Sequence, residues 1–126
     1  MSWYQSILAS VTAWFDQPVE RSQREQQRVD RIAATLTLYT RNHCTECVHL
    51  LRQLKKLNVS ITVKNIRRCH IYQKELLAAG QSTNIPCLRI EKGRQVRWIS
   101  QADDIDRFFD QKFAPIAQNE RLEQAH

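Results

Sequence analysis

Between residues 36 and 113 the chain alternates strand patterns with apolar helical patterns, and this order limits the possible folds more than any other feature. Strand patterns cover residues 36–40 and 59–66, and a helical pattern covers residues 47–57 between them. Strands that alternate with helices favour a sheet with helices packed against it. The first half of this region therefore predicts a strand–helix–strand unit.

The second half of the region predicts one more helix, a hairpin and a final helix. Residues 72–79 have a helical pattern that ends at Gly80, the residue that most readily adopts the left-handed conformation after a helix. Residues 87–91 and 95–99 form a hairpin pattern, and residues 103–113 form the last helix. The order βαβαββα predicts an α/β fold in which helices cover a mixed four-stranded sheet.

The apolar positions within these segments predict which side chains are buried. In the second strand, Val59, Ile61 and Val63 recur at period two, as they would on one face of a sheet. Residues at helical spacing form the predicted buried faces of the two longer helices. These residues are Leu50, Leu51, Leu54 and Leu57 in the first helix, and Ile105, Phe108 and Phe109 in the last.

Residues 1–35 form a predicted helical extension ahead of the domain at 36–113, and residues 114–126 form a polar tail. Over residues 3–15 apolar side chains recur at helical spacing, and Ser22 with the residues after it has a capping-box sequence that begins a second helix. Packing of the first stripe on its own domain is the simplest interpretation. Contact with a membrane surface and self-association are the two alternatives.

The composition fits a single domain in a reducing compartment. A chain of 126 residues can bury one hydrophobic core. Its four cysteines are too few for a disulfide-rich secreted scaffold, and its start lacks the pattern of a signal peptide, so we expect a cytoplasmic location. The net charge is +6, but Lys and Arg are scattered along the chain, which argues against a nucleic-acid partner.

Cys44 and Cys47 stand where the first strand pattern gives way to a helix, and this position predicts a redox site. A sulfur at the start of a helix faces unpaired backbone N–H groups and the positive end of the helix dipole, which favour thiolate. Zinc would need four ligands, and adding His43, Cys69 and His70 supplies no second Cys-x-x-Cys pair, so we expect no metal.

Four features occur in a fixed order around this pair of cysteines. They are Arg41, three residues before the motif; the motif Cys44-Thr45-Glu46-Cys47; the segment Asn84-Ile85-Pro86; and the pair Asp103-Asp104 before the last helix. Together they resemble the glutaredoxin family of the thioredoxin-fold superfamily over residues 36–113. The third is similar to the family's T-V-P element, which contains a cis-proline. The extension further resembles a bacterial subgroup whose domain is similar to the N-terminal domain of glutathione transferases.

The resemblance implies a thiol–disulfide oxidoreductase that serves redox homeostasis through a redox-active disulfide. Cys44 would be the nucleophile and Cys47 the resolving thiol, with glutathione as cosubstrate and no bound cofactor. Its partners would be disulfide-bonded or glutathionylated proteins.

The resemblance also implies a set of glutathione-binding residues. Arg41 would hold the thiolate or a glutathione carboxylate, and Ile85 next to Pro86 would offer its backbone polar groups to the peptide-like part of glutathione. Asp103 and Asp104 would meet the ammonium group of the γ-glutamyl end.

The sequence departs from the family pattern at two places. Between the cysteines, Thr45-Glu46 replaces the usual Pro-Tyr or Pro-Phe, and the carboxylate of Glu46 should weaken the activation of Cys44. Gln101-Ala102 stands where the family has two glycines, which allow close backbone approach to a ligand, so the site could accept glutathione differently or prefer another thiol. Trp98 could form an apolar wall of the pocket, although burial in the core is the more common role of tryptophan.

A second class of function fits the same motif. The domain could be a non-catalytic binding module, or it could carry an iron–sulfur cluster bridged between two chains with glutathione as a ligand. Cys69 and Cys87 are interpreted as bystanders, the first in a basic loop and the second in a core strand. His49 is expected on the outer face of its helix.

Overall fold

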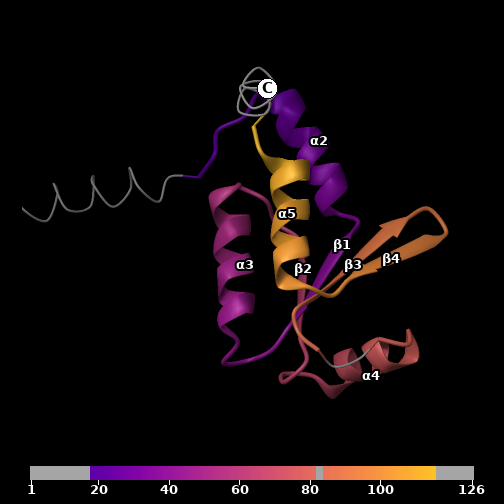
Figure 1. Cartoon of the computed structure of the whole chain (residues 1–126). Helices are drawn as coiled ribbons and strands as arrows, with labels where there is room; N and C mark the ends of the chain where they lie inside the picture. The colour runs from indigo at the N-terminus through magenta and orange to yellow at the C-terminus, as the bar shows by residue number, and fades with distance from the viewer. Residues whose placement is uncertain (1–17, 82–83, 116–126) are drawn as a thin grey trace, which may run out of the picture.

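The computed structural model describes residues 18–81 and 84–115, and the stripe predicted at residues 3–15 and most of the tail lie outside these ranges (Figure 1). In chain order, the elements are α2 (Gln23–Ala33), β1 (Leu36–Thr40), α3 (Thr45–Lys56), β2 (Thr62–Asn65), α4 (His70–Ala78), β3 (Cys87–Lys92), β4 (Gln95–Ile99) and α5 (Ala102–Phe113). From β1 onward this is the predicted order βαβαββα. None of the described helices is both long and apolar enough to cross a membrane.

The four strands form one mixed sheet in the order β2-β1-β3-β4. β1 pairs in parallel with β2, with Leu38 opposite Val63, and antiparallel with β3, with Leu38 opposite Leu88. β3 and β4 form the predicted antiparallel hairpin, whose turn contains Gly93 at a φ of 64°. The predicted fold class, a thioredoxin-type mixed sheet, is confirmed.

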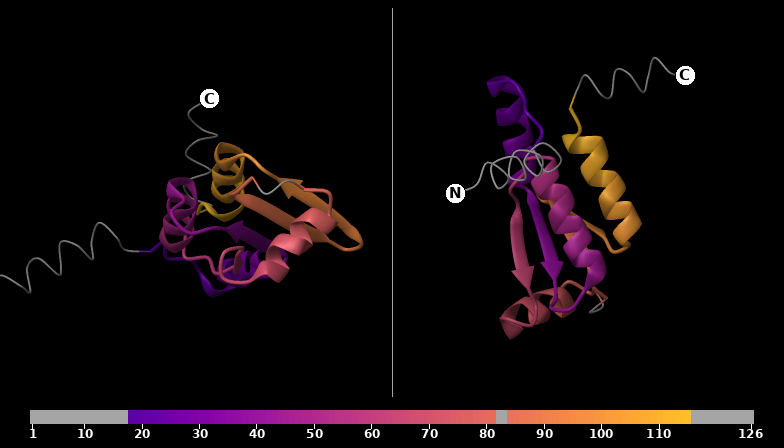
Figure 2. Two further views of the ribbon diagram at one scale, coloured as in Figure 1. Left: turned by 90° about the horizontal axis from the view of Figure 1, so that it is seen from below. Right: turned by 90° about the vertical axis from the view of Figure 1, so that its left-hand side faces the viewer.

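Helices cover both faces of this sheet, as the two views of Figure 2 show. On one face α2, α3 and α5 pack over the larger core, in which Leu38, Leu50, Leu88, Phe109 and Phe113 are fully buried. On the other face α4 packs over a smaller core. Side chains alternate between faces along a strand, so Leu38 and Tyr39 of β1 belong to different cores.

The second helix of the extension is fixed to the domain. Ser22 caps α2, because its hydroxyl oxygen accepts the N–H of Glu25 at 3.3 Å, as the capping-box sequence predicts. The guanidinium of Arg21 donates to the backbone carbonyls of Phe113 and Asn58, at the ends of α5 and α3. Val29 is 1% exposed in the larger core. α2 is therefore part of the folded domain.

A network of polar side chains links α4 to β1 and β2 of the sheet. The hydroxyl of Tyr39 donates to the carboxylate of Glu75 at 2.9 Å, and the ammonium of Lys64 donates to the same oxygen at 2.8 Å. Burial, followed by the hydrogen bond to Glu75, raises the pKa of Tyr39 to about 12. The bonds to Lys64 and Tyr39 lower the pKa of Glu75. This network joins β1, β2 and α4 next to the smaller core.

The prediction for the second strand was partly wrong. β2 covers only Thr62–Asn65, because the chain first makes a left-handed turn at Asn58 and the N–H of Val59 bonds back to Leu54. Val59 is buried in the larger core, but Val63 is 42% exposed, since β2 is an edge strand.

The helix boundaries and one helix face also differ from the prediction. α3 begins at Thr45 and ends at Lys56, and α4 covers His70–Ala78, so both begin two residues earlier than predicted. Leu51 is 38% exposed, because the buried side of α3 is narrower than the four-leucine pattern indicates. Gly80 follows α4 with a φ of 76°, as predicted.

Candidate functional site

Cys44 is the N-cap residue of α3. Its backbone is extended, and its sulfur accepts a hydrogen bond from the backbone N–H of Cys47 at 3.2 Å. His43, immediately before it, has a φ of 56°, a left-handed conformation that few residues other than glycine adopt. This turn redirects the chain from β1 into α3. The sulfur therefore takes the capping position, where a backbone donor and the positive helix end both stabilise negative charge.

The two sulfurs of the motif differ in their surroundings. Cys44 is 7% exposed and Cys47 is 2% exposed, and both are free thiols. Burial, followed by the hydrogen bond with Cys44, raises the pKa of Cys47 to about 12, although the backbone N–H and the charge of Arg41 act in the opposite direction. Cys47 therefore stays protonated at neutral pH.

A cavity of about 350 Å³ lies beside this motif. Four of the five predicted glutathione-binding residues line it, namely Arg41, Ile85, Pro86 and Asp103. The peptide bond between Ile85 and Pro86 is cis, as the resemblance to the T-V-P element implies. The fold thus brings together the ends of three segments that are far apart in the sequence: the turn before α3, the turn before β3 and the start of α5.

The same cavity contains residues at which the sequence departs from the glutaredoxin pattern. Glu46, Gln101 and Ala102 line it, together with Ser100 and Asn84. The charged groups of the lining are the two carboxylates of Glu46 and Asp103 and the guanidinium of Arg41. Ser100 was not among the predicted site residues, and its position beside the Gly-Gly replacement is the signal that could have identified it.

Asp104 and Trp98 do not line this cavity. The carboxylate of Asp104 lies 3.5 Å from the guanidinium of Arg107, and both residues border a neighbouring cavity that Trp98 also lines. The ring of Trp98 is half-buried with its centroid 5.7 Å from that of Tyr39, so it contributes to the smaller core. A ligand contact for Asp104 stays a prediction.

The other two cysteines occupy the positions expected of bystanders, and Cys69 also stands at the start of a helix. Cys87 is 1% exposed in the smaller core, and burial raises its pKa to about 11. Cys69 is half-buried, and it is the N-cap residue of α4 rather than part of a wholly solvated loop. His49 points outward from α3, as predicted, with its ring 3.6 Å from Asp106.

Burial of Cys87 makes the stability of the fold sensitive to alkaline pH. The folded protein keeps this proton up to about pH 11, whereas an unfolded chain releases it near pH 9.0. The contribution is therefore fully present below pH 9.0 and is lost as the pH rises toward about 11. From this group alone we expect the free energy of unfolding to fall by up to about 1.4 kcal/mol per pH unit.

Urea unfolding in the presence of reductant, at pH values on both sides of 9.0, measures this effect. A Cys87→Ala variant should show a shallower fall than the parent chain, while the remaining slope reports Cys47 and Tyr39. Equal slopes in both proteins would contradict the prediction, because they would mean that Cys87 ionises equally readily in the folded and unfolded chains.

Within residues 18–81 and 84–115, no group of three or more His, Cys, Asp or Glu side chains is placed to hold a metal ion. The structure therefore presents the motif as a dithiol with a polar cavity next to it.

Comparison with known proteins finds one family model that resembles part of this chain. The family model described as Glutaredoxin matches residues 36–96, which include the motif, the cis-proline and most of the hairpin. A search of curated proteins found no match.

Three solved structures resemble the chain in outline. The thioredoxin-like protein BC3987 is 22% identical, with a TM-score of 0.46 over 57% of this chain and 96% of its own. The glutaredoxin-like protein NrdH-redoxin from Escherichia coli, described as having a thioredoxin-like activity profile, is 25% identical, with a TM-score of 0.43 over 57% and 91%. Maleylacetoacetate isomerase from Anaeromyxobacter dehalogenans 2CP-1, with bound dicarboxyethyl glutathione and citrate, is 20% identical, with a TM-score of 0.44 over 63% and 34%.

The match to the glutaredoxin model covers β1, α3, β2, α4, β3 and both cysteines of the motif, and it ends before Ser100, Gln101, Ala102 and Asp103 of the cavity. It supports the chemistry of a thiol–disulfide oxidoreductase at this motif. Residues 36–96, just under half of the chain, match this model, so the protein is glutaredoxin-like over this region.

Proposed function

We propose that the protein is a glutathione-dependent thiol–disulfide oxidoreductase in which Cys44 attacks the substrate disulfide and Cys47 resolves the intermediate. The observation that carries the proposal is the position of the Cys44 sulfur, which caps α3 and accepts the N–H of Cys47 at 3.2 Å. Arg41 and Glu46, which flank it in the sequence, both line the 350 Å³ cavity. Cys44 itself does not line this cavity, but it stands in the sequence between two residues that do.

In the first step the Cys44 thiolate attacks a glutathionylated protein at the glutathione sulfur. A disulfide forms between Cys44 and glutathione, and the protein substrate leaves as a thiolate that takes up a proton. Cys44 is the attacking sulfur because Cys47 is the more buried and, with a pKa of about 12, holds its proton.

The mixed disulfide is resolved by one of two thiols. A second glutathione attacks it, regenerates the Cys44 thiolate and leaves as glutathione disulfide. Alternatively, Cys47 loses its proton and attacks Cys44, which forms the Cys44–Cys47 disulfide and releases glutathione. The first route consumes one free glutathione for each mixed disulfide that is reduced, and the glutathione disulfide that leaves contains this molecule and the glutathione of the substrate.

The cavity has charged groups that complement both the carboxylate and the ammonium group of glutathione. The Arg41 guanidinium suits a carboxylate, and Asp103 suits the ammonium of the γ-glutamyl end. Ile85 and Pro86 form the wall beside which the peptide-like part would lie. Glu46 in the same wall repels a glutathione carboxylate, so binding should be weaker than Arg41 and Asp103 alone would give.

The proposal is tested by following reduction of a glutathione mixed disulfide by the full chain, with glutathione and glutathione reductase regenerating the thiols. Turnover that depends on glutathione supports it. Turnover that occurs only with a dithiol reductant would retain the oxidoreductase chemistry and remove the role of glutathione.

Replacing Glu46 by glutamine should raise the rate with glutathione disulfide. One carboxylate near an anionic substrate costs about 1 kcal/mol at 4 Å in water, so we expect a gain of up to about fivefold. The gain should shrink at high salt, because exposed charges are screened. Stopped-flow mixing of the reduced protein with glutathione disulfide measures this rate.

Two controls separate this electrostatic effect from a general change in reactivity. Glu91→Gln removes the same charge from β3, outside the cavity, and should leave the rate unchanged. The second control is an uncharged substrate, hydroxyethyl disulfide. Glu46→Gln should raise the rate with this substrate much less than it raises the rate with glutathione disulfide. An equal gain on both substrates would contradict repulsion of glutathione as the cause.

A further inference from the structure

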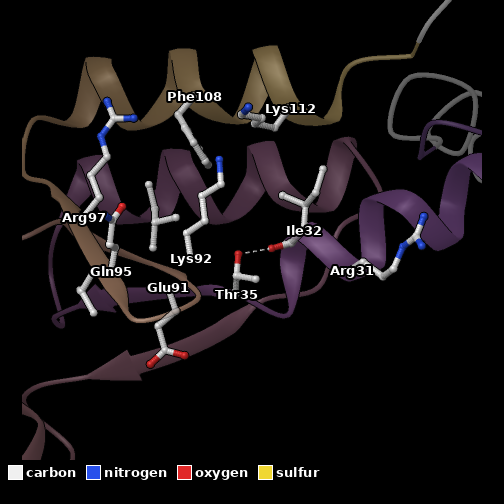
Figure 3. Close-up of a pocket in the computed structure, with 11 residues that line it drawn as sticks. Arg31, Ile32, Thr35, Glu91, Lys92, Gln95, Arg97, Phe108 and Lys112 are labelled. Carbon is white, nitrogen blue, oxygen red and sulfur yellow. Dashed lines mark hydrogen bonds between the residues drawn. The ribbon is translucent and has the colours of Figure 1, made fainter.

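A second and larger cavity, of about 730 Å³, lies away from the cysteines (Figure 3). It lies between α2, the β3–β4 hairpin and α5, and it is lined by Thr35, which precedes β1. Cys44 follows the other end of β1. At about 3.3 Å per residue, the length of this strand places the two sites roughly 16 Å apart. The cavity is therefore separate from the redox site.

The floor of this groove is apolar although it faces solvent. Ile32 of α2, Ile90 of β3, Val96 of β4 and Phe108 of α5 line it. Val96 is 44% exposed, and the other three are half-buried. Apolar side chains from four different elements thus converge on one open surface, where a ligand could remove them from water.

The rim of the groove is cationic. Lys92 and Arg97 extend from the hairpin toward α5, and Lys112 lies on α5 next to Phe108 (Figure 3). The Lys112 ammonium is 6.0 Å from the centre of the Phe108 ring. None of these three side chains has an ion pair with any residue that the structure describes.

The one acidic residue of the lining does not neutralise this rim. The carboxylate of Glu91 points away from Lys92 and pairs with the guanidinium of Arg89 (Figure 3). The groove therefore combines an apolar floor with uncompensated positive charge on the side next to α5. This combination complements a molecule that has an apolar body and an anionic end.

We propose that this groove binds a small amphipathic carboxylate, such as a medium-chain fatty acid, with its chain on the apolar floor and its carboxylate beside Lys92 and Lys112. The volume is in the range of small-molecule sites, about 300–1,000 Å³. A positive rim on one side suits a single anionic group, and the floor of four apolar side chains suits an unbranched chain. Nothing in this assignment depends on the chemistry of Cys44.

Decanoate, used below its micelle concentration, is the probe for this site. Titration of the full chain, followed by nuclear magnetic resonance of the backbone amides, should show saturable shifts at Ile90, Val96 and Phe108. Decanol, which keeps the chain and lacks the charge, and hexanoate, which keeps the charge and shortens the chain, should each bind at least about tenfold more weakly.

The double variant Lys92→Gln/Lys112→Gln should weaken decanoate binding by about tenfold. The matched control, Lys56→Gln/Lys74→Gln, removes the same charge from exposed positions outside the groove and should bind decanoate like the parent chain. Equal binding of decanoate and decanol, or equal loss in both double variants, would overturn the proposal. So would a concentration-dependent dimer that shifts the same amides and excludes decanoate, because the groove would then hold a second copy of the chain.

Discussion

Replacing Cys44 by serine should abolish thiol–disulfide exchange and reduce the rate to the uncatalysed background. Serine preserves the size of the side chain and its ability to cap α3 through an oxygen acceptor, so the fold should be retained. A hydroxyl does not attack disulfides under these conditions, whereas a thiolate does. The glutathione-coupled reduction of a mixed disulfide, with the fold checked by circular dichroism, measures this loss.

Replacing Cys47 by serine provides the matched control, because it changes the other sulfur of the same motif. This variant should still complete the first step and should turn over through the route in which a second glutathione resolves the intermediate. If Cys47→Ser lost the first step and Cys44→Ser kept it, the assignment of nucleophile and resolving thiol would be reversed.

The second large effect concerns stability. Replacing Phe109 by alanine should lower the free energy of unfolding by about 3–5 kcal/mol, the usual cost of removing a buried phenylalanine. Phe109 is fully buried on α5, and its ring centroid lies 6.1 Å from that of Phe113 in the larger core. The total free energy of unfolding of a single domain is about 5–15 kcal/mol, so this variant should be close to unfolding. Urea unfolding followed by circular dichroism measures the change.

Leu77→Ala serves as the control for this effect. It removes a large apolar side chain from α4, but Leu77 is 56% exposed, so we expect a change within about 0.5 kcal/mol. Similar losses in the two variants would show that α5 does not anchor the larger core. Phe109→Ala should also affect the redox site, because Ala102 and Asp103 in the first turn of the same helix, α5, line the cavity of that site.

The sequence predicted the sheet because its strongest local signals agree with the fold. The alternation after Leu36 predicts the order of strands and helices along the chain, and the hairpin and the stop at Gly80 have clear turn residues. The failures have physical causes. Val63 has the spacing of a buried strand residue but lies on an edge strand, and Leu51 lies beyond the narrow buried side of α3. Periodicity alone does not show how widely a face is covered.

For the site too, short sequence segments predict some features, and others depend on how the chain folds. Cys44 and Cys47 are recognisable from spacing, and the cis bond before Pro86 follows from the resemblance of a short segment. That Arg41 and Asp103 line one cavity depends on the tertiary fold, which brings distant turns together. The second cavity has no motif, because its apolar floor and cationic rim come from single residues on separate elements.

The most direct test of this account is mass spectrometry of the Cys47→Ser protein after reaction with glutathione disulfide. The account predicts one glutathione adduct, located on Cys44 by peptide mapping and removed by added glutathione. In the Cys44→Ser protein no such adduct should form at Cys47, which is buried and holds its proton. An unmodified Cys44, or an adduct found on Cys69 instead, would contradict the central claim that Cys44 is the nucleophile of a glutathione-dependent oxidoreductase.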